Sequence, residues 1–547
     1  MSKDTLVKGT LILTIAALTA RALGVVQRVP LVYLLQEKGM AWYGIAFNLY
    51  SVLLVIATAG VPSALSKMIS ERTALGKRAE AERIYRAAAV FSLAAGLVMT
   101  ASLYVLAPYS ASWAGNPEAT GAIRALAPAS LLFPLIAIMR GYFQGRQNMM
   151  PNGLSQIIEQ IFRVAASVVL AYLLLGQGLE TAAAGASFGG VVGSIAAVAV
   201  MLYFARKLRR ADAAASAGRT AVSHLPYRTI YRQLFGLSIP IVIFSITVTL
   251  IYTIDSMLVT PSLQRQAGRE AAVELLGILS GRAQSLAGIP IILAVALSQS
   301  IVPIISAAYS KKEMEQVAGQ TGRVLQLAIL SGLPAVLVIC VAARPINGFI
   351  FGNATGSPVV DAYAAPVIIA LTVSAIFQIV MQTSGAVLMG MGRMRILVWA
   401  VVVGIAVKLA GSYALAPVFG IYGIIGATAL CFIVMTFFNL YTLKKEVVFR
   451  VLGGKRWIGL TITTMVIAAI GYGLDLLGRS YIHPFGDPRW DEMVQTLIQC
   501  GVAAAAYPVL LLLTGTMTLR DLDSMPGPLR RLARPLLQRL GGAKQTQ

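Results

Sequence analysis

Five basic residues lie inside long apolar stretches of this 547-residue chain, where charged side chains are rare. They are Arg21, Arg28, Arg163, Arg282 and Lys408. An arginine or lysine at the centre of a bilayer costs about 2.5 to 3.5 kcal/mol on insertion scales, so such residues usually serve a function. We expect only two acids, Glu159 and Asp255, to lie comparably deep. At least three of the cations are therefore predicted to face water, lipid headgroups or a bound anion.

Arg21 and Arg28 are seven residues apart in one apolar stretch, which places both on one face of a helix, about 10 Å apart along its axis. Pro30 removes a backbone hydrogen bond and is expected to bend this helix. A bent helix with two arginines on one face suits the wall of a polar cavity. The alternative is that Arg28 extends to the membrane interface and Arg21 forms a salt bridge with another helix.

The other buried charges allow structural as well as functional interpretations. Glu159 and Arg163 are four residues apart, the spacing of an ion pair within one helix, which favours a structural role. Lys408 has no partner on its own helix. Asp255 either binds a cation or proton for coupling or forms a salt bridge with Arg282. Arg282 is either an anchor at the interface or a substrate-binding residue.

The apolar stretches that hold these charges are long enough to cross a bilayer, which takes about 20 residues of helix. Only 12% of the residues are charged, 57% are hydrophobic, and the mean hydropathy is +0.76. We therefore expect an all-α polytopic membrane protein with fourteen transmembrane helices. The predicted spans are 10–35, 41–65, 87–108, 120–141, 153–175, 181–205, 234–259, 277–308, 322–343, 363–390, 396–416, 421–443, 457–478 and 493–514.

Most of the 45 lysines and arginines fall in alternate gaps between these spans, for example in 67–86, 206–210 and 444–456. The positive-inside rule then places both termini in the cytoplasm. The net charge of +23 thus reflects topology and contact with anionic inner-leaflet lipid, and no nucleic-acid partner is expected.

The chain looks duplicated, because weak landmarks recur in the same order in both halves, such as 144–146 and 391–393. An even number of spans per repeat gives parallel repeats. We predict two six-helix lobes, 1–205 and 233–445, joined by a cytoplasmic linker at 206–232. An appended helix pair follows at 446–520, then a basic cytoplasmic tail at 521–547, which is either an amphipathic helix on the inner leaflet or disordered.

No motif in the chain indicates catalysis. Cys340, Cys431 and Cys500 are scattered through apolar helices, and the two histidines, His224 and His483, lie in separate gaps. No hydrophilic gap carries a nucleotide-binding loop, a metal-ligand spacing or a catalytic triad. We expect a transporter rather than an enzyme, with no catalytic residue, metal or cofactor.

The N-terminal part carries the most specific resemblance to a known family, in Lys8–Thr14, Ala20–Val26, Asn48–Tyr50 and Ile56–Lys67. These segments resemble the multidrug/oligosaccharidyl-lipid/polysaccharide (MOP) exporter superfamily. The similarity is to its SpoVB/YtgP branch of polysaccharide biosynthesis and export proteins, which includes lipid II flippases. The resemblance implies a bacterial cytoplasmic membrane protein whose two lobes alternate between inward-open and outward-open states.

The resemblance also implies a cargo and a site for it. The cargo would be an undecaprenyl-diphosphate-linked sugar, and Arg21 and Arg282 fall where the family places the cavity arginines that bind the diphosphate. Arg28 follows Arg21 by seven residues where the family spaces its pair by six, and Gln27 occupies that position. The arginine that the family carries in its second helix has no counterpart in 53–56. The predicted substrate-binding residues are Arg21, Arg28, Arg282, Asn48 and Lys408.

Our prediction is a lipid-linked oligosaccharide flippase in peptidoglycan synthesis, with lipid II as the first candidate cargo and cell-wall synthases as potential partners. One alternative keeps the fold and changes the cargo to another lipid-linked polysaccharide repeat unit. A second is a cation-coupled drug exporter of the same superfamily, although such pumps favour acidic cavities. A third is a membrane scaffold without transport, in which the buried charges would all pair.

Overall fold

The chain folds into α-helices. The computed structural model describes residues 3–75, 77–215, 226–352, 357–481, 484 and 486–516, and no β-strand occurs within these ranges. Helix is the expected outcome for such apolar segments, because in hydrocarbon every backbone N–H and C=O must find its partner inside the protein. The all-α prediction is confirmed. The predicted tail at 521–547 and the middle of the predicted linker, 216–225, lie outside the described residues.

Thirteen helical segments in the described ranges are long and apolar enough to cross a membrane. The first, Ala22–Thr73, contains parts of both the first and the second predicted spans. The two are merged because helix α1 (Lys3–Thr58) continues through a kink at Gln36, where φ is 53° and ψ is −168°. The count of fourteen and the cytoplasmic placement of both termini stay predictions.

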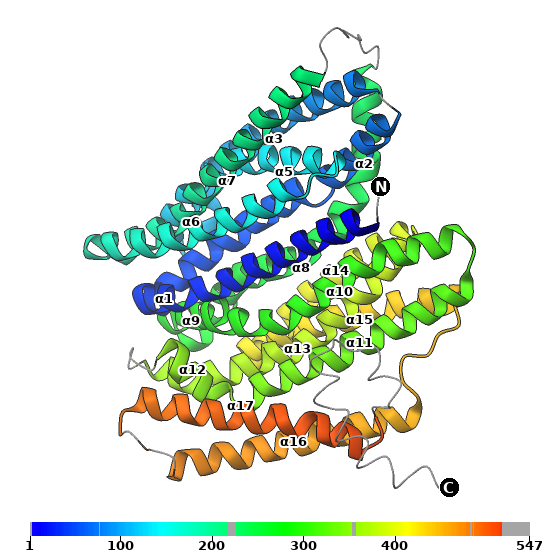
Figure 1. The fold of residues 1–547 in the computed structure, drawn as a ribbon. Helices are drawn as coiled ribbons and strands as arrows, with labels where there is room; N and C mark the ends of the chain where they lie inside the picture. The colour runs from blue at the N-terminus through cyan, green and yellow to red at the C-terminus, as the bar shows by residue number, and fades with distance from the viewer. Residues whose placement is uncertain are drawn as a thin grey trace, which may run out of the picture. The chain divides into compact units, whose positions relative to one another are not determined.

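Helix packing divides the chain into two compact units, of which the first contains Met1–Ser285 and Met394–Cys431. In this unit α1 packs against α6, α8 and α9, and α14 packs against α8 (Figure 1). Its elements are α1, α2 (Val61–Ala74), α3 (Arg78–Trp113), η1 (Pro117–Ala119), α4 (Thr120–Leu126), α5 (Ala129–Gly145), α6 (Met150–Leu174), η2 (Leu175–Gln177), α7 (Leu179–Ala215), α8 (Tyr227–Ala267), α9 (Arg269–Gly277), the π-helical turn η3 (Ile278–Ala283) and α14 (Met394–Phe419).

Helices α6 and α7 approach closely because glycines on α7 face α6. A Cβ atom at Gly189 would lie 2.1 Å from the Ser167 hydroxyl, and one at Gly193 would lie 2.6 Å from the Glu159 carbonyl oxygen. Two small residues four apart let membrane helices bring their backbones together. This contact holds the charged face of α6 inside the unit.

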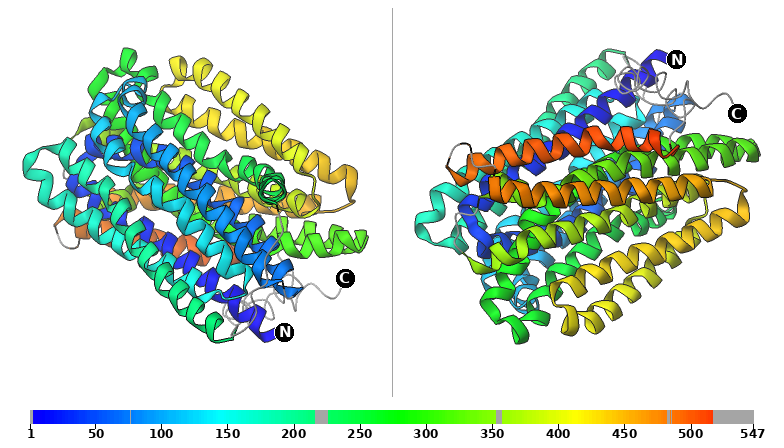
Figure 2. Two further views of the ribbon diagram at one scale, coloured as in Figure 1. Left: turned by 90° about the horizontal axis from the view of Figure 1, so that it is seen from above. Right: turned by 90° about the horizontal axis from the view of Figure 1, so that it is seen from below.

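The second unit contains Leu286–Arg393 and Phe432–Gln547. Its helices are α10 (Gln284–Ser310), α11 (Met314–Val341), α12 (Ala343–Phe351), α13 (Pro358–Gly390), the last part of α15 (Ile421–Glu446), α16 (Gly454–Tyr481) and α17 (Pro488–Leu513). The last two lie side by side, coloured orange to red in Figure 2. They pack on α11, where the Tyr507 hydroxyl donates to the Leu330 carbonyl oxygen at 3.2 Å.

The compact units do not follow the boundaries of the predicted lobes. Helix α14, which the sequence assigns to 233–445, belongs to the first unit together with residues 421–431 of α15. The reason is its packing along α8. The division into lobes, linker and appended pair stays a prediction.

Candidate functional site

Arg28 is held on α1 without a carboxylate partner among the described residues. Its Nη1 donates to the Ser280 carbonyl oxygen, and its Cζ lies 5.6 Å from the centre of the Phe47 ring. Ser280 lies in η3, the π-helical turn between α9 and α10, and π-helical turns occur frequently at functional sites. The side chain is half-buried. Arg28 is thus a cation inside a membrane span whose charge is met by a neutral acceptor and an aromatic face.

Arg282 lies near the start of the predicted eighth span. It is fully buried and paired with Glu37. Its Nη2 donates to Glu37 Oε1 at 2.6 Å and its Nε to the same oxygen at 3.0 Å. The predicted alternative in which Asp255 pairs with Arg282 is therefore wrong in this structure. Glu37 escaped the sequence prediction because it falls in the short gap between the first two spans, which the kink of α1 buries.

Lys408 and Asp255 form a second buried ion pair, between α14 and α8. The Lys408 ammonium also donates to the Ile424 carbonyl oxygen at 2.8 Å. The Thr428 hydroxyl donates to Asp255 Oδ2 at 3.1 Å. Lys408 has no partner on its own helix because the carboxylate that pairs with it, that of Asp255, lies on α8.

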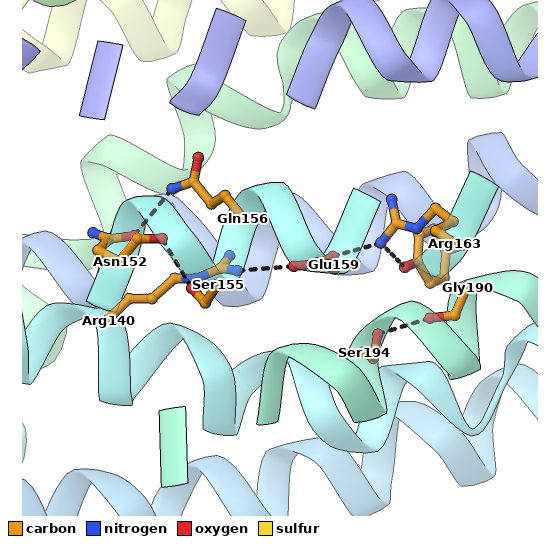
Figure 3. Close-up of polar contacts among 9 residues, drawn as sticks. Arg140, Asn152, Ser155, Gln156, Glu159, Arg163, Gly190 and Ser194 are labelled. Carbon is orange, nitrogen blue, oxygen red and sulfur yellow. Dashed lines mark hydrogen bonds and ion pairs between the residues drawn. The ribbon is translucent and has the colours of Figure 1, made fainter. Parts of the chain in front are cut away.

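The third charged cluster lies on α6 and includes the predicted pair (Figure 3). Arg163 Nη2 donates to Glu159 Oε1 at 2.6 Å and to the Tyr50 hydroxyl at 3.2 Å. Arg140 on α5 donates from Nη2 to Glu159 Oε2 at 2.8 Å, and from Nε to the Ser155 hydroxyl at 2.9 Å. The predicted ion pair of Glu159 and Arg163 is present, and its structural role stays a prediction. Sequence reasoning missed Arg140 because it lies near a span end, where basic residues are common.

Two further predicted residues lie on the same helix as Arg28. Asn48 donates from Nδ2 to the Tyr252 backbone carbonyl oxygen at 3.4 Å. The backbone carbonyl oxygen of Asn48 accepts from the Thr253 hydroxyl at 3.0 Å. Asn48 therefore joins α1 to α8 at mid-length. Arg21 belongs to α1, and its side chain lies outside the described residues.

The expected surplus of unpaired cations is smaller than the sequence indicated. Arg163, Arg282 and Lys408 each have a carboxylate within ion-pair distance. The prediction that at least three of the five face water, headgroups or an anion is wrong, because Glu37 is a third buried acid. Arg28 is the member of the set that has no carboxylate within ion-pair distance among the described residues.

The first unit also contains an apolar cavity of about 210 Å³ that lies apart from these charges. Residues of α1, α2, α3, α5 and α8 line it: Ile56, Ala57, Val61, Phe91, Ser92, Ala95, Met99, Pro134, Phe235, Ser238, Ile239, Val242 and Ile243. A lining of this kind suits hydrocarbon and offers no group for a phosphate. The polar candidate site is therefore the Arg28 region of α1, α8 and η3.

Many long apolar helices with charged side chains held among them define a multi-pass membrane protein. The fold is similar to an inward-facing multidrug resistance MATE family transporter of the MOP superfamily. The TM-score is 0.60 and the identity 14%, covering 77% of this chain and 97% of the transporter. This likeness establishes the MATE-like fold.

Sequence comparison leads to the family. The lipid II flippase MurJ of Bacillus subtilis (strain 168) is 25% identical over 522 residues, 93% of this chain and 95% of the flippase. Stage V sporulation protein B of the same organism is 27% identical over 448 residues, 81% of this chain and 85% of that protein. Residues 6–309 match the polysaccharide biosynthesis protein family, and the chain belongs to that family. It is a bacterial multi-pass membrane transport protein and not an enzyme.

Proposed function

We propose that this protein is an alternating-access flippase for an undecaprenyl-diphosphate-linked oligosaccharide, moving it from the inner to the outer leaflet. Lipid II is the first candidate cargo, which would place the protein in peptidoglycan synthesis and in the control of cell shape. The proposal is supported by the family and by similarity to a lipid II flippase over more than nine tenths of both chains.

The observation that carries the proposal is the environment of Arg28. Among the described residues, the Arg28 guanidinium in its membrane span contacts a carbonyl oxygen and an aromatic ring but no carboxylate. Guanidinium groups grip phosphate oxygens with two parallel hydrogen bonds, each charge-assisted and stronger than a bond to a neutral carbonyl. A diphosphate therefore competes well with the Ser280 carbonyl oxygen for Arg28.

A flippase must also release its cargo, so its grip has to differ between the two states. Arg28 on α1 and Ser280 on η3 come from segments more than 200 residues apart in the chain. Any shift of α1 against η3 changes the position of the guanidinium. We propose that Arg21, Arg282, Asn48 and Lys408 complete the site once the cargo has entered, as the buried pairs of Arg282 and Lys408 open.

The proposal is tested by headgroup accessibility of labelled lipid II in vesicles that contain the purified protein. Accessibility should rise with the parent protein and stay at the level of empty vesicles with Arg28→Ala. Arg124→Ala is the matched control, because Arg124 also lies over a ring, that of Tyr104 at 5.0 Å, but is exposed on α4. Full activity of Arg28→Ala would contradict the proposal.

The alternative cargo is another undecaprenyl-linked polysaccharide repeat unit. A rescue experiment in cells distinguishes it from lipid II. Rescue of a strain depleted of its lipid II flippase, and loss of that rescue with Arg28→Ala, identifies lipid II. Transport of a different lipid-linked glycan without rescue identifies the rival cargo. A cation-coupled drug exporter would instead confer drug resistance on overexpression, which an unpaired arginine in the span disfavours.

A further inference from the structure

The Glu37–Arg282 ion pair is the best-buried polar contact between α1 and the segment that follows α9. The Arg282 side chain is 0% exposed and that of Glu37 3% exposed. Arg282 Nε and Nη2 both donate to Glu37 Oε1, and Glu37 Oε2 is buried with no hydrogen-bond partner among the described residues. The carboxylate is therefore only half satisfied by hydrogen bonds, and the buried Oε2 carries a desolvation cost in the paired state.

Further polar contacts surround this pair at the same ends of the helices, all in gaps that we predict to face outward. Lys38 next to Glu37 pairs with Glu270 on α9 at 3.0 Å. Arg269 pairs with Glu118 on η1 at 2.5 Å. These two pairs are largely exposed and contribute little stability. The buried pair is therefore the central element of the contact, and we call the pair of Glu37 and Arg282 the outer latch.

The backbone around Glu37 is set in a strained and tightly packed position. Gln36 has a positive φ of 53°, which non-glycine residues adopt rarely and at a cost. Glu37 packs so closely on α9 that a Cβ atom at Gly277 would lie 2.0 Å from its carbonyl oxygen. Arg282 itself is carried by the π-helical turn η3. Strain of this kind persists only where the surrounding contacts hold it, and opening the latch would release it.

We propose that Glu37 is an internal competitor of the cargo's diphosphate for Arg282. In the latched state the carboxylate occupies the guanidinium and ties α1 to η3. When a diphosphate takes Arg282, Glu37 loses its counter-ion, the latch opens, and the outer end of the site becomes accessible. This inference rests on the proposed function, because it assigns Arg282 to the cargo. It makes Glu37 a positioning residue that couples cargo binding to outward opening.

The test uses the full chain with its three cysteines replaced by serine and a cysteine introduced at Met40. Met40 is fully buried beside Gly281 in the latch region, so a membrane-impermeant maleimide added outside the cell should label it slowly. Glu37→Gln should raise the labelling rate about tenfold without cargo. It should also bind undecaprenyl diphosphate about tenfold more tightly, because the competitor is gone. A merely structural role predicts weaker binding.

Glu270→Gln is the matched control, because it removes an exposed ion pair between α1 and α9 that lies outside the outer latch, and it should change neither measurement. Labelling of Glu37→Gln at the parent rate, or weaker binding of undecaprenyl diphosphate, would overturn the proposal. If Glu37→Gln fails to fold, Glu37→Asp replaces it. The shorter carboxylate keeps the charge but reaches Arg282 less well, so labelling and affinity should again both rise, and a rise in neither overturns the proposal.

The charge swap of Glu37→Arg with Arg282→Glu separates this inference from the proposed function. It rebuilds the latch and should return labelling to the parent rate, but it moves the cation and should weaken binding of undecaprenyl diphosphate. If the labelling results hold while no variant binds undecaprenyl diphosphate, the latch exists and the proposed cargo is wrong. If the cargo binds and is flipped while labelling never changes, the flippase stands and the latch is wrong.

Discussion

The Lys408 ammonium on α14 and the Asp255 carboxylate on α8 form an ion pair in which both side chains are almost completely buried. A carbonyl oxygen of α15 accepts from the same ammonium, and a hydroxyl of α15 donates to the carboxylate. Three helices therefore meet at one pair of opposite charges. The position at which Asp255 would hold a coupling cation is filled in this structure by a cation of the chain itself.

Breaking this pair should destabilise the protein strongly. Asp255→Asn leaves the ammonium buried without its carboxylate, and we expect the free energy of unfolding in detergent to fall by about 3–5 kcal/mol. Asp255→Asn combined with Lys408→Met removes both charges and should recover most of that loss. Denaturant unfolding of the three variants measures the effect. A double variant as unstable as the single one would show that the pair contributes through its packing and not its charge.

The cluster on α6 gives a second prediction about stability. Among the described residues, Glu159 is the carboxylate partner of both Arg140 and Arg163, so Glu159→Gln leaves two guanidiniums without a counter-ion. We expect a loss of about 3–5 kcal/mol. Glu82→Gln is the control, because Glu82 forms an exposed pair with Arg86 four residues along α3 and should leave unfolding unchanged. Equal effects of the two substitutions would contradict the expected role of burial.

Gly277 should tolerate no side chain. The Cβ atom of Gly277→Ala would lie 2.0 Å from the backbone carbonyl oxygen of Glu37, so α9 and α1 must separate. We expect a destabilisation of about 1–3 kcal/mol, measured as a lower Tm in detergent. Gly236→Ala on α8 meets nothing within 4 Å and should raise the Tm or leave it unchanged. A normal Tm for Gly277→Ala would show that this contact yields without cost.

Arg28→Lys tests whether charge alone is sufficient at the proposed site. A lysine keeps the positive charge but cannot form two parallel hydrogen bonds to a diphosphate, so flipping should fall by about tenfold or more. The variant should fold normally, because Arg28 has no carboxylate partner among the described residues. Lipid II accessibility and the Tm of the same preparations check both statements. Full flipping by Arg28→Lys would argue for simple electrostatic attraction.

The sequence by itself determined the class of the protein and its local contacts. Apolar length and the distribution of basic residues are properties of short segments, so they indicated membrane helices without any knowledge of packing. The pairing of Glu159 with Arg163 was predictable for the same reason, since one turn of helix brings residues four apart together. The family resemblance was also predicted from sequence motifs, and the family match over residues 6–309 confirms it.

The tertiary structure decided which charges neutralise one another. Arg282 and Glu37 are 245 positions apart, and their contact depends on the kink at Gln36 and on how α1 packs along α9 and η3. The ion pair of Lys408 with Asp255 likewise depends on how α14 packs along α8. Spacing along the chain carries no information about such contacts, because helices that pack side by side can come from any two parts of the sequence. That Arg28 has no carboxylate partner among the described residues could therefore be seen only after the helices were packed.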